Sequence, residues 1–312
     1  MIYLDNAANT KIDPIILEEM MPYLKGYGNP SSLHSAGRKC RKAIEEARIC
    51  VAKAINTIPQ NIFFVNSATE GNNWVISNYN KVLCSRVEHH SILNNPKCII
   101  MNDNTSLEQQ IHNEKPDLVT KMLVCNETGE IYDIKHLTEI CHNMGIPFHC
   151  DAVQAFSHIP VDVKYLGVDS LVISGHKFHA YGSGIVYLKD PSKYKPLLYG
   201  GGQEMGLRSS TENVASIVSM GKACELYNYS PKRDKRCKEI QMKFYNAFSE
   251  MQDVHFNTDI NNSISTTINV GFKGVESESL MLLLDMDGIC VSAGSACNSG
   301  SLEPSHVLKA IN

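Results

Sequence analysis

Short apolar runs alternate with helical segments along most of this sequence, and that alternation constrains the fold more than any other feature. Apolar runs predict strands at residues 61–65, 81–84, 98–101, 118–125, 146–150, 168–174 and 184–188. Helices are predicted over residues 35–56, 70–79, 133–144 and 211–227, and Asp13 with Pro14 begins another. This order indicates an α/β fold, with a mostly parallel central sheet covered by helices on both faces.

The pattern changes after Ser230 and Pro231, which we interpret as a linker. A charged helix is predicted over residues 232–251, followed by a strand over 266–272, a helix over 278–285 and a strand over 289–292. This order is typical of a smaller α+β domain. We therefore expect two domains from a chain of 312 residues.

Charge and hydropathy exclude several classes of protein. The chain has 29 basic and 33 acidic side chains, and this slight acidic excess argues against direct nucleic-acid binding through phosphate neutralisation. No apolar stretch approaches the roughly 18 residues of a membrane span. Residues 1–10 do not resemble a signal peptide. We expect a cytoplasmic protein without membrane contact.

Eleven cysteines are present, and no two are spaced as C-x-x-C. Most lie in apolar runs, where a free cysteine packs as a small hydrophobic residue, and a chain of this size does not need disulfides. No metal site is expected, because His89 and His90 would point to opposite faces of a strand.

Cys297 differs from the other cysteines in its surroundings. Residues 292–301 contain no large apolar side chain, so this cysteine does not fill a core. We expect it on an accessible loop, where a thiolate can act as a nucleophile. An incidental exposed cysteine is the alternative, but exposed free thiols are a liability, which favours a function.

Polar residues follow two neighbouring predicted strands. Lys177 ends the segment Ser174-Gly175-His176-Lys177, while Asp151 follows the strand at 146–150 and Gln154 comes one turn later. Ligands of parallel sheets bind beyond the carboxyl ends of the strands. A lysine there can form a Schiff base with an aldehyde cofactor, and a carboxylate can keep a pyridinium nitrogen protonated. Lys177 alone would read as a solvated lysine, but together with Asp151 it predicts a pyridoxal phosphate site.

The phosphate of such a cofactor needs hydrogen-bond donors. Residues 66–72 connect a strand to a helix, and their backbone N–H groups with the Thr69 hydroxyl could hold an anion, although a capped helix start explains the same residues. Ser174 and His176 could add side-chain donors. His89, just past another strand, could stack on the cofactor ring and move protons near pH 7.

Nine ordered motifs resemble those of the cysteine desulfurases of the NifS/IscS type, in the class V aminotransferase group of fold-type I pyridoxal phosphate enzymes. They cover nearly the whole chain, in the order in which the family has them. The motifs are Tyr3-Leu4-Asp5-Asn6-Ala7-Ala8, Gly28-Asn29-Pro30-Ser31-Ser32-Leu33-His34, Ala68-Thr69-Glu70, Glu88-His89, Asn126-Glu127, Asp151-Ala152-Val153-Gln154, Ser174-Gly175-His176-Lys177, Gly200-Gly201-Gly202-Gln203-Glu204, and Gly294-Ser295-Ala296-Cys297 with Ser305-His306-Val307-Leu308.

The resemblance implies three catalytic residues. Lys177 would attach the cofactor covalently, and His89 would stack on its ring and transfer protons. Cys297 would attack the sulfur of L-cysteine bound to the cofactor, which gives alanine and an enzyme persulfide. The sulfur would then pass to an acceptor, such as a scaffold protein for iron–sulfur clusters, or serve tRNA thiolation.

The resemblance also implies binding roles and an assembly. Asp151 would pair with the ring nitrogen, and Arg208 with Asn6 and Asn126 would contact the substrate. A homodimer would form, in which Thr211 reaches the phosphate of the partner subunit. The residues implied to bind the cofactor are Ala68, Thr69, Asn126, Asp151, Gln154, Ser174, His176, Lys177 and Thr211. The implied domains are a large cofactor-binding domain at 14–229 and a small, apparently C-terminally shortened domain at 1–13 plus 230–312, which carries the cysteine loop.

The family pattern is not complete in this sequence. Relatives usually continue after the Ser-His-Val-Leu helix into a segment with an arginine that grips the substrate carboxylate, and the sequence ending at Asn312 has no counterpart. Loss of that contact would cost on the order of 2–5 kcal/mol of substrate binding. A weakly active or inactive interaction protein is therefore an alternative to an active desulfurase. A selenocysteine lyase and a class V aminotransferase are others, although an aminotransferase needs no nucleophilic thiol.

Overall fold

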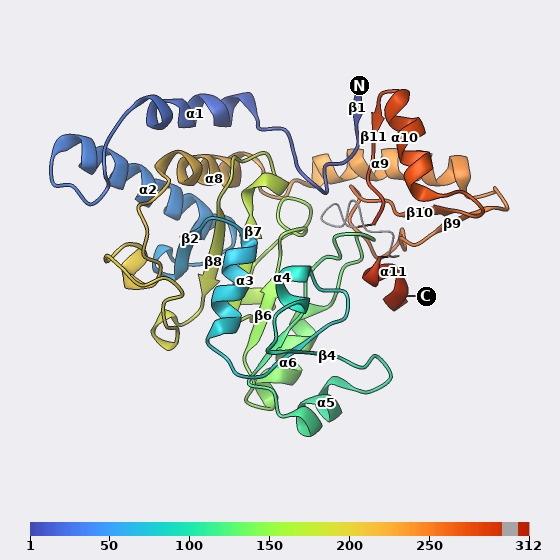
Figure 1. Cartoon of the computed structure of the whole chain (residues 1–312), viewed down its shortest axis with the longest axis horizontal. Coiled ribbons are helices and arrows are strands. Elements are labelled where there is room, and N and C mark those ends of the chain that lie inside the picture. Colours follow the sequence, from blue (N-terminus) through green and yellow to red (C-terminus); the bar gives the residue numbers. More distant parts are fainter. Residues whose placement is uncertain (295–304, 312) are drawn as a thin grey trace.

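A seven-stranded sheet forms the centre of the protein (Figure 1). The computed structural model describes residues 1–294 and 305–311. The strands lie in the order β2-β8-β7-β6-β5-β3-β4, and only β8 runs antiparallel to its neighbours in this sheet, which confirms a mostly parallel arrangement. Their bounds are β2 (Ile62–Val65), β3 (Val82–Cys84), β4 (Cys98–Ile100), β5 (Leu118–Thr120), β6 (Phe148–Asp151), β7 (Ser170–Ser174) and β8 (Gly184–Leu188).

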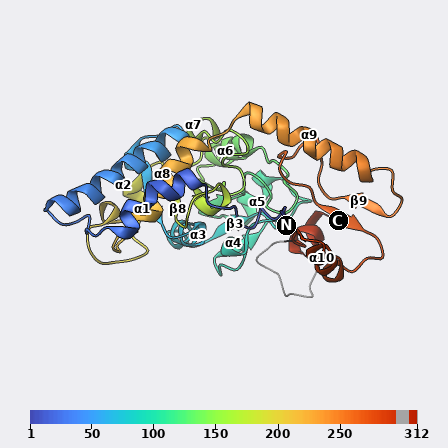
Figure 2. The same ribbon diagram turned by 90° about the horizontal axis from the view of Figure 1, so that it is seen from above.

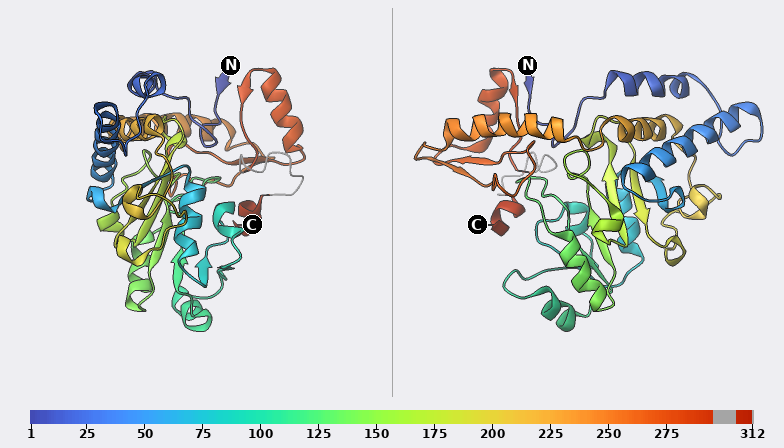
Figure 3. Two further views of the ribbon diagram at one scale, coloured as in Figure 1. Left: turned by 60° about the vertical axis from the view of Figure 1, so that its left-hand side comes forward. Right: turned by 180° about the vertical axis from the view of Figure 1, so that it is seen from behind.

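Helices cover both faces of this sheet, as the alternating pattern predicts. α3 and α4 lie in front of the strands in Figure 1, whereas α2, α6 and α8 lie in front when the molecule is seen from behind in Figure 3. Short helices α5 and α7 complete the connections. The bounds are α2 (Ser35–Ala54), α3 (Ala68–Ser77), α4 (His90–Leu93), α5 (Leu107–Glu114), α6 (Ile134–Asn143), α7 (Val163–Leu166) and α8 (Val214–Leu226).

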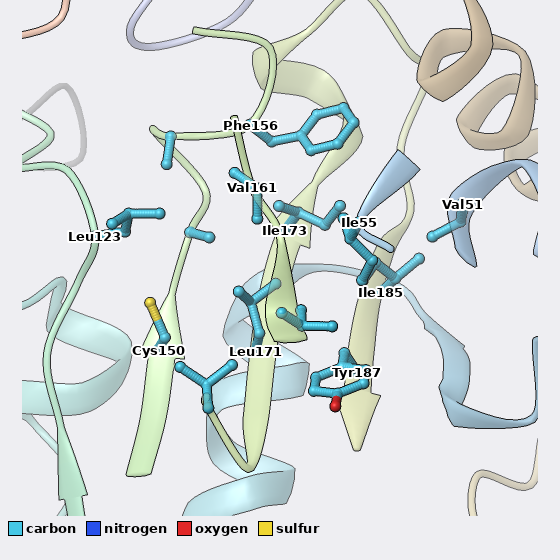
Figure 4. Packing of buried hydrophobic residues seen from close by; sticks show 14 of the residues in the cluster. Val51, Ile55, Leu123, Cys150, Phe156, Val161, Leu171, Ile173, Ile185 and Tyr187 are labelled. Carbon is cyan, nitrogen blue, oxygen red and sulfur yellow. The ribbon is translucent and has the colours of Figure 1, made fainter. Parts of the chain in front are cut away.

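Alternate strand residues supply two separate cores. Leu171 and Ile173 of β7 pack with α2, α6 and α8, and Figure 4 shows them in one cluster with Ile185 of β8 and with Ile55, which follows α2. Val172, between them in sequence, packs with α3 on the opposite face. Side chains of a strand point alternately to its two faces, so strands buried on both sides read as continuous apolar runs.

α2 shows how the sequence places one of these helices. The side chain of His34 accepts a hydrogen bond from the Gly37 N–H and caps its start. The apolar stripe at positions 40, 43, 47 and 51 is buried, as its spacing predicts. α2 packs closely on α8, since a Cβ atom on Gly221 would lie 2.5 Å from the Cα atom of Ala47. The neighbouring α1 (Pro14–Lys25), capped by Asp13 as predicted, extends the same layer (Figure 2).

Residues from both chain ends come together beside the main sheet. β1 (Ile2–Tyr3) pairs in parallel with β11 (Ile289–Cys290), and β9 (Val254–Phe256) pairs with β10 (Val270–Phe272). α9 (Pro231–Phe248), α10 (Ser277–Met286) and α11 (His306–Ile311) lie on this side of the molecule (Figure 1). The division into domains at 14–229 and at 1–13 plus 230–312 stays a prediction.

The structure corrects some predicted boundaries. The helix predicted over residues 211–227 begins only at Val214, because the Asn213 side chain caps it, and Thr211 therefore lies in the preceding loop. The strand predicted over 118–125 ends at Thr120. Ser230 and Pro231 lead directly into α9, so helix rather than a separate linker begins there. Among the described residues, no helix is both long and apolar enough to cross a membrane.

Candidate active site

The carboxyl ends of the parallel strands gather most of the predicted site residues along one edge of the sheet. Asp151 is the last residue of β6 and Ser174 the last of β7, while His89 follows β3 and Asn126 follows β5. The charges of Asp151 and Lys177 both act on the His89 imidazole, so the three groups share one electrostatic environment. This is the edge at which parallel α/β sheets bind ligands.

Lys177 lies in the 3₁₀ turn η2 (Gly175–Lys177), directly after β7. Its Nζ atom donates hydrogen bonds to the carbonyl oxygens of Ala7, at 2.6 Å, and Ala8, at 2.8 Å. Gln154 Nε2 donates to the same Ala7 oxygen at 3.0 Å. Thr10 fixes this N-terminal segment, because its N–H and its hydroxyl both donate to the His176 carbonyl. The segment around Ala7 thus holds both side chains through backbone oxygens, which residue type alone could not indicate.

The Asp151 carboxylate is held by two donors. The Val153 N–H donates to its Oδ1 at 3.0 Å, and the Asn72 side chain donates to its Oδ2 at 2.9 Å. Asn72, from α3, is fully buried and was not among the residues singled out from the sequence. Behind it, His149 Nε2 lies 2.9 Å from Asn72 Oδ1, and His149 Nδ1 lies 2.8 Å from Ser170 Oγ.

The two histidines predicted at the site are both disfavoured as cations. Burial, followed by the charge of Lys177, lowers the pKa of His176 to about 4, and its Nδ1 lies 2.9 Å from Ser174 Oγ. Burial also lowers the pKa of His89, against the raising effect of Asp151. His89 Nδ1 accepts a hydrogen bond from the Ser91 N–H at 3.1 Å and lies 2.9 Å from Ser91 Oγ. Neutral imidazoles are therefore the dominant form at neutral pH.

The predicted phosphate-binding turn is the start of α3. Ser67 caps the helix by accepting from the Glu70 N–H, and the first intrahelical bond runs from Gly71 to Ser67. The N–H groups of Ala68 and Thr69 therefore have no acceptor within the helix, which suits an anion. Gly184 lets this turn rest on β8, because a Cβ there would lie 2.9 Å from the Ala68 nitrogen.

The structure also places three residues that the sequence assigns to the partner contact and the substrate: Arg208, Thr211 and Asn6. Arg208 forms a bidentate ion pair with Glu70, with Nε at 2.6 Å and Nη2 at 3.1 Å from the two carboxylate oxygens. Arg208 is thus fixed beside the α3 start. Thr211 is exposed in the loop before α8, and Asn6 is exposed near the N-terminus.

The donor set fits pyridoxal phosphate. Asn126 Oδ1 is buried and has no hydrogen-bond partner among the described residues. An unsatisfied buried acceptor lowers the stability of a protein by roughly 1–3 kcal/mol. A ligand hydroxyl would satisfy it. Three further groups match the cofactor. The Lys177 amine suits its aldehyde, the Asp151 carboxylate suits its ring nitrogen, and the unused N–H groups at the start of α3 suit its phosphate.

Cys297 lies outside the described residues, but the residues on either side of 295–304 are placed. Ser292 Oγ donates to Asp5 at 2.8 Å, and Ser305 Oγ donates to the buried Glu127 carboxylate at 2.5 Å. A Cβ on Gly294 would lie 3.3 Å from Ser305 Cβ, so the two ends are adjacent beside Glu127. In the described part of the chain, no three His, Cys, Asp or Glu side chains are grouped to hold a metal ion.

Comparisons with known proteins agree with this geometry. The family model for class-V aminotransferases matches residues 2–312. The chain is 40% identical to a cysteine desulfurase IscS of Dictyoglomus turgidum, over 100% of this chain and 86% of that protein. A solved NifS-like protein superposes with a TM-score of 0.89 at 30% identity, over 99% of this chain and 89% of the other. A structure described as SspA in complex with cysteine gives a TM-score of 0.83 at 29% identity, over 100% and 94%. The chain therefore belongs to the class-V aminotransferase family of pyridoxal phosphate enzymes, and within it to the cysteine desulfurases.

Proposed function

We propose that this protein converts L-cysteine to L-alanine and transfers the sulfur to Cys297 as a persulfide. The observation that carries the proposal is the arrangement of Lys177 and Asp151 at one edge of the sheet. Gly294 and Ser305, which flank the segment that contains Cys297, lie next to each other beside Glu127. The family membership and the cysteine in the SspA structure support the choice of substrate.

We propose that Lys177 binds the cofactor covalently and that Asp151 pairs with its ring nitrogen. His89 would stack on the ring, and Asn126 and Gln154 would contact its hydroxyl. The phosphate would be held by Ala68, Thr69, Ser174 and His176. In a homodimer, Thr211 of the partner subunit would also contact it. When bound, pyridoxal phosphate withdraws electrons from the α-carbon of the substrate.

Proton transfer and the attack on the substrate sulfur are the tasks of the chain's own residues. Lys177, whose amine is held by the Ala7 and Ala8 carbonyls, is placed to exchange a proton with the substrate. His89, kept neutral by burial, can hold a proton at its Nε2 atom. The Cys297 thiolate forms a bond to the substrate sulfur while the Cβ–S bond of the substrate breaks. The substrate Cβ atom keeps the electrons of that bond and takes up a proton, and the product is released as alanine.

We further propose that Asn6 and Arg208 contribute to the substrate side of the site and that an iron–sulfur scaffold protein takes the sulfur. tRNA thiolation is the alternative destination. The bidentate pair with Glu70 would keep Arg208 beside the phosphate turn, from which its remaining Nη1 group could reach a carboxylate.

A turnover assay tests the proposed function. Protein purified with pyridoxal phosphate is incubated with L-cysteine and a thiol reductant, and we expect alanine and sulfide in equal amounts. No alanine would refute the desulfurase assignment and favour an inactive interaction protein. The same assay with L-selenocysteine separates the lyase alternative, which predicts turnover of selenocysteine but not of cysteine.

A further inference from the structure

A single buried amide, that of Asn72, lies between two residues of the proposed cofactor site, Asp151 and His89, and reaches the second through Ser91. The two side-chain N–H groups of Asn72 lie 2.9 Å from Asp151 Oδ2 and 2.9 Å from Ser91 Oγ. Its Oδ1 faces His149 Nε2 at 2.9 Å. Asn72, His149 and Ser170 are completely buried, so water does not compete for these bonds.

The chemistry of the partners fixes the orientation of the Asn72 amide and the tautomer of His149. A carboxylate only accepts, so the nitrogen of Asn72 must face Asp151 and its oxygen must face His149. His149 therefore carries its proton on Nε2, and its Nδ1 accepts from the Ser170 hydroxyl at 2.8 Å. Burial lowers the pKa of His149 to about 3, which keeps the ring neutral and the order of donors unchanged.

The second N–H of Asn72 orients the Ser91 hydroxyl, which lies beside the His89 ring. Ser91 Oγ accepts from Asn72 and can direct its own proton to His89 Nδ1, 2.9 Å away. The Ser91 N–H also donates to that Nδ1. With two donors at Nδ1, neutral His89 carries its proton on Nε2.

We propose that Asn72 is a positioning residue for the cofactor site, holding the Asp151 carboxylate in place, fixing His149 as the Nε2–H tautomer and orienting the Ser91 hydroxyl toward His89 Nδ1. The inference rests on the proposed function and adds the residue that positions the Asp151 carboxylate and the Ser91 hydroxyl beside His89. The Ser91 N–H would still keep His89 Nδ1 as an acceptor, but loss of the amide would leave the Asp151 carboxylate without one of its donors and His149 Nε2 without its acceptor. A merely structural asparagine would change neither.

Nitrogen NMR of the cofactor-loaded protein with labelled histidine measures this directly. Ring-nitrogen shifts distinguish protonated from unprotonated positions, and His89→Asn and His149→Asn variants assign the two residues. We expect both rings to carry the proton on Nε2 in the wild type. A proton on Nδ1 of either ring would overturn the inference, whether or not the enzyme turns over cysteine.

Substitution of the amide tests its contacts. Asn72→Leu and the smaller Asn72→Ala both remove the two donors and the acceptor, so we expect the His149 tautomer to change, while the Ser91 N–H keeps the proton of His89 on Nε2. We also expect cofactor binding to weaken on the order of tenfold or more, because Asp151 loses a charge-assisted donor, and the pH dependence of the visible absorbance to shift.

Gln110→Leu is the matched control, because Gln110 is also a buried amide, but its side chain bonds to Asn102 and to the Thr105 carbonyl rather than to any residue of the proposed site. It should retain wild-type tautomers and absorbance. If the wild type binds cofactor and releases alanine, yet the Asn72 variants match Gln110→Leu in the His149 tautomer and in absorbance, the inference is wrong and the proposed function stands. If the wild type binds no cofactor, both fail.

Discussion

Arg48 and Glu204 form a bidentate ion pair inside the protein, with both guanidinium-to-carboxylate distances at 2.8 Å. Their side chains are only 6% and 3% exposed. The pair is completed by backbone groups of the first strand of the sheet, since Arg48 donates to the Ile62 carbonyl and the Phe64 N–H donates to Glu204. It fastens the Gly200-Gly201-Gly202-Gln203-Glu204 motif, which precedes Arg208 and Thr211, to the main sheet.

Removal of the buried carboxylate should destabilise the protein strongly. We expect Glu204→Ala to lower the free energy of unfolding by about 3–5 kcal/mol, because the buried Arg48 loses its bidentate partner and keeps only the exposed Glu45 as a counter-charge. Glu45→Ala is the control: Glu45 pairs with the same Arg48 at 3.3 Å but is 56% exposed, so it should cost less than about 1 kcal/mol. Urea unfolding measures both, and equal losses would contradict the role of the buried pair.

Glu88 should make the protein less stable as the pH rises from about 4.5 to about 7. Burial raises the pKa of its carboxyl to about 7, and one of its oxygens has no hydrogen-bond partner among the described residues. The folded protein then holds a proton that the unfolded chain releases above about 4.5, so stability is lost at about 1.4 kcal/mol per pH unit toward 7. Urea unfolding of Glu88→Gln should show its stability rising relative to wild type from pH 5 to 7. A constant difference would refute this.

His149 should act on stability with the opposite sign. Because its pKa falls from 6.5 to about 3 on folding, the unfolded chain binds a proton first as the pH drops below 6.5. The wild type should therefore lose about 1.4 kcal/mol per pH unit between pH 6 and 4, relative to His149→Gln. Equal slopes for the two proteins in urea unfolding at each pH would show that this histidine titrates normally.

Lys177→Ala should abolish covalent cofactor attachment. Borohydride reduction of the wild type should fix the cofactor to the peptide that contains residue 177, and the variant should show no such adduct. Alanine release should fall by roughly 10²–10⁴-fold or more, the contribution of proton transfer alone. Lys189→Ala removes a half-exposed lysine paired with Asp169 and should leave both unchanged. A retained adduct in Lys177→Ala would assign the attachment elsewhere.

The sequence predicts what depends on local pattern. Apolar runs place the strands, and the residues that follow them, such as Asp151 and Lys177, lie at the sheet edge where the pattern puts them. The sequence could not show Asn72 beside Asp151, because 79 residues separate them and only folding brings them together. The same holds for the Ala7 carbonyl at Lys177, since a backbone oxygen leaves no trace in residue type.

Boundaries failed where a side chain competes with the helix pattern. The segment around Thr211 is compatible with a helix, but Asn213 accepts the Ser216 N–H and delays the helix start. A buried polar residue such as His149 also defies a pattern in which strand interiors are apolar, because its partners come from another element.

The transfer of sulfur to Cys297 is the central claim, and mass spectrometry tests it most directly. The cofactor-loaded protein is exposed to L-cysteine without reductant, alkylated and digested. Cys290 and Cys297 fall in one tryptic peptide, because no lysine or arginine lies between them, so fragmentation of that peptide distinguishes the two. We predict one added sulfur atom at Cys297, none at Cys290, and none anywhere in Cys297→Ala that retains its cofactor absorbance. An added sulfur on another cysteine, or its persistence in Cys297→Ala, would contradict the account.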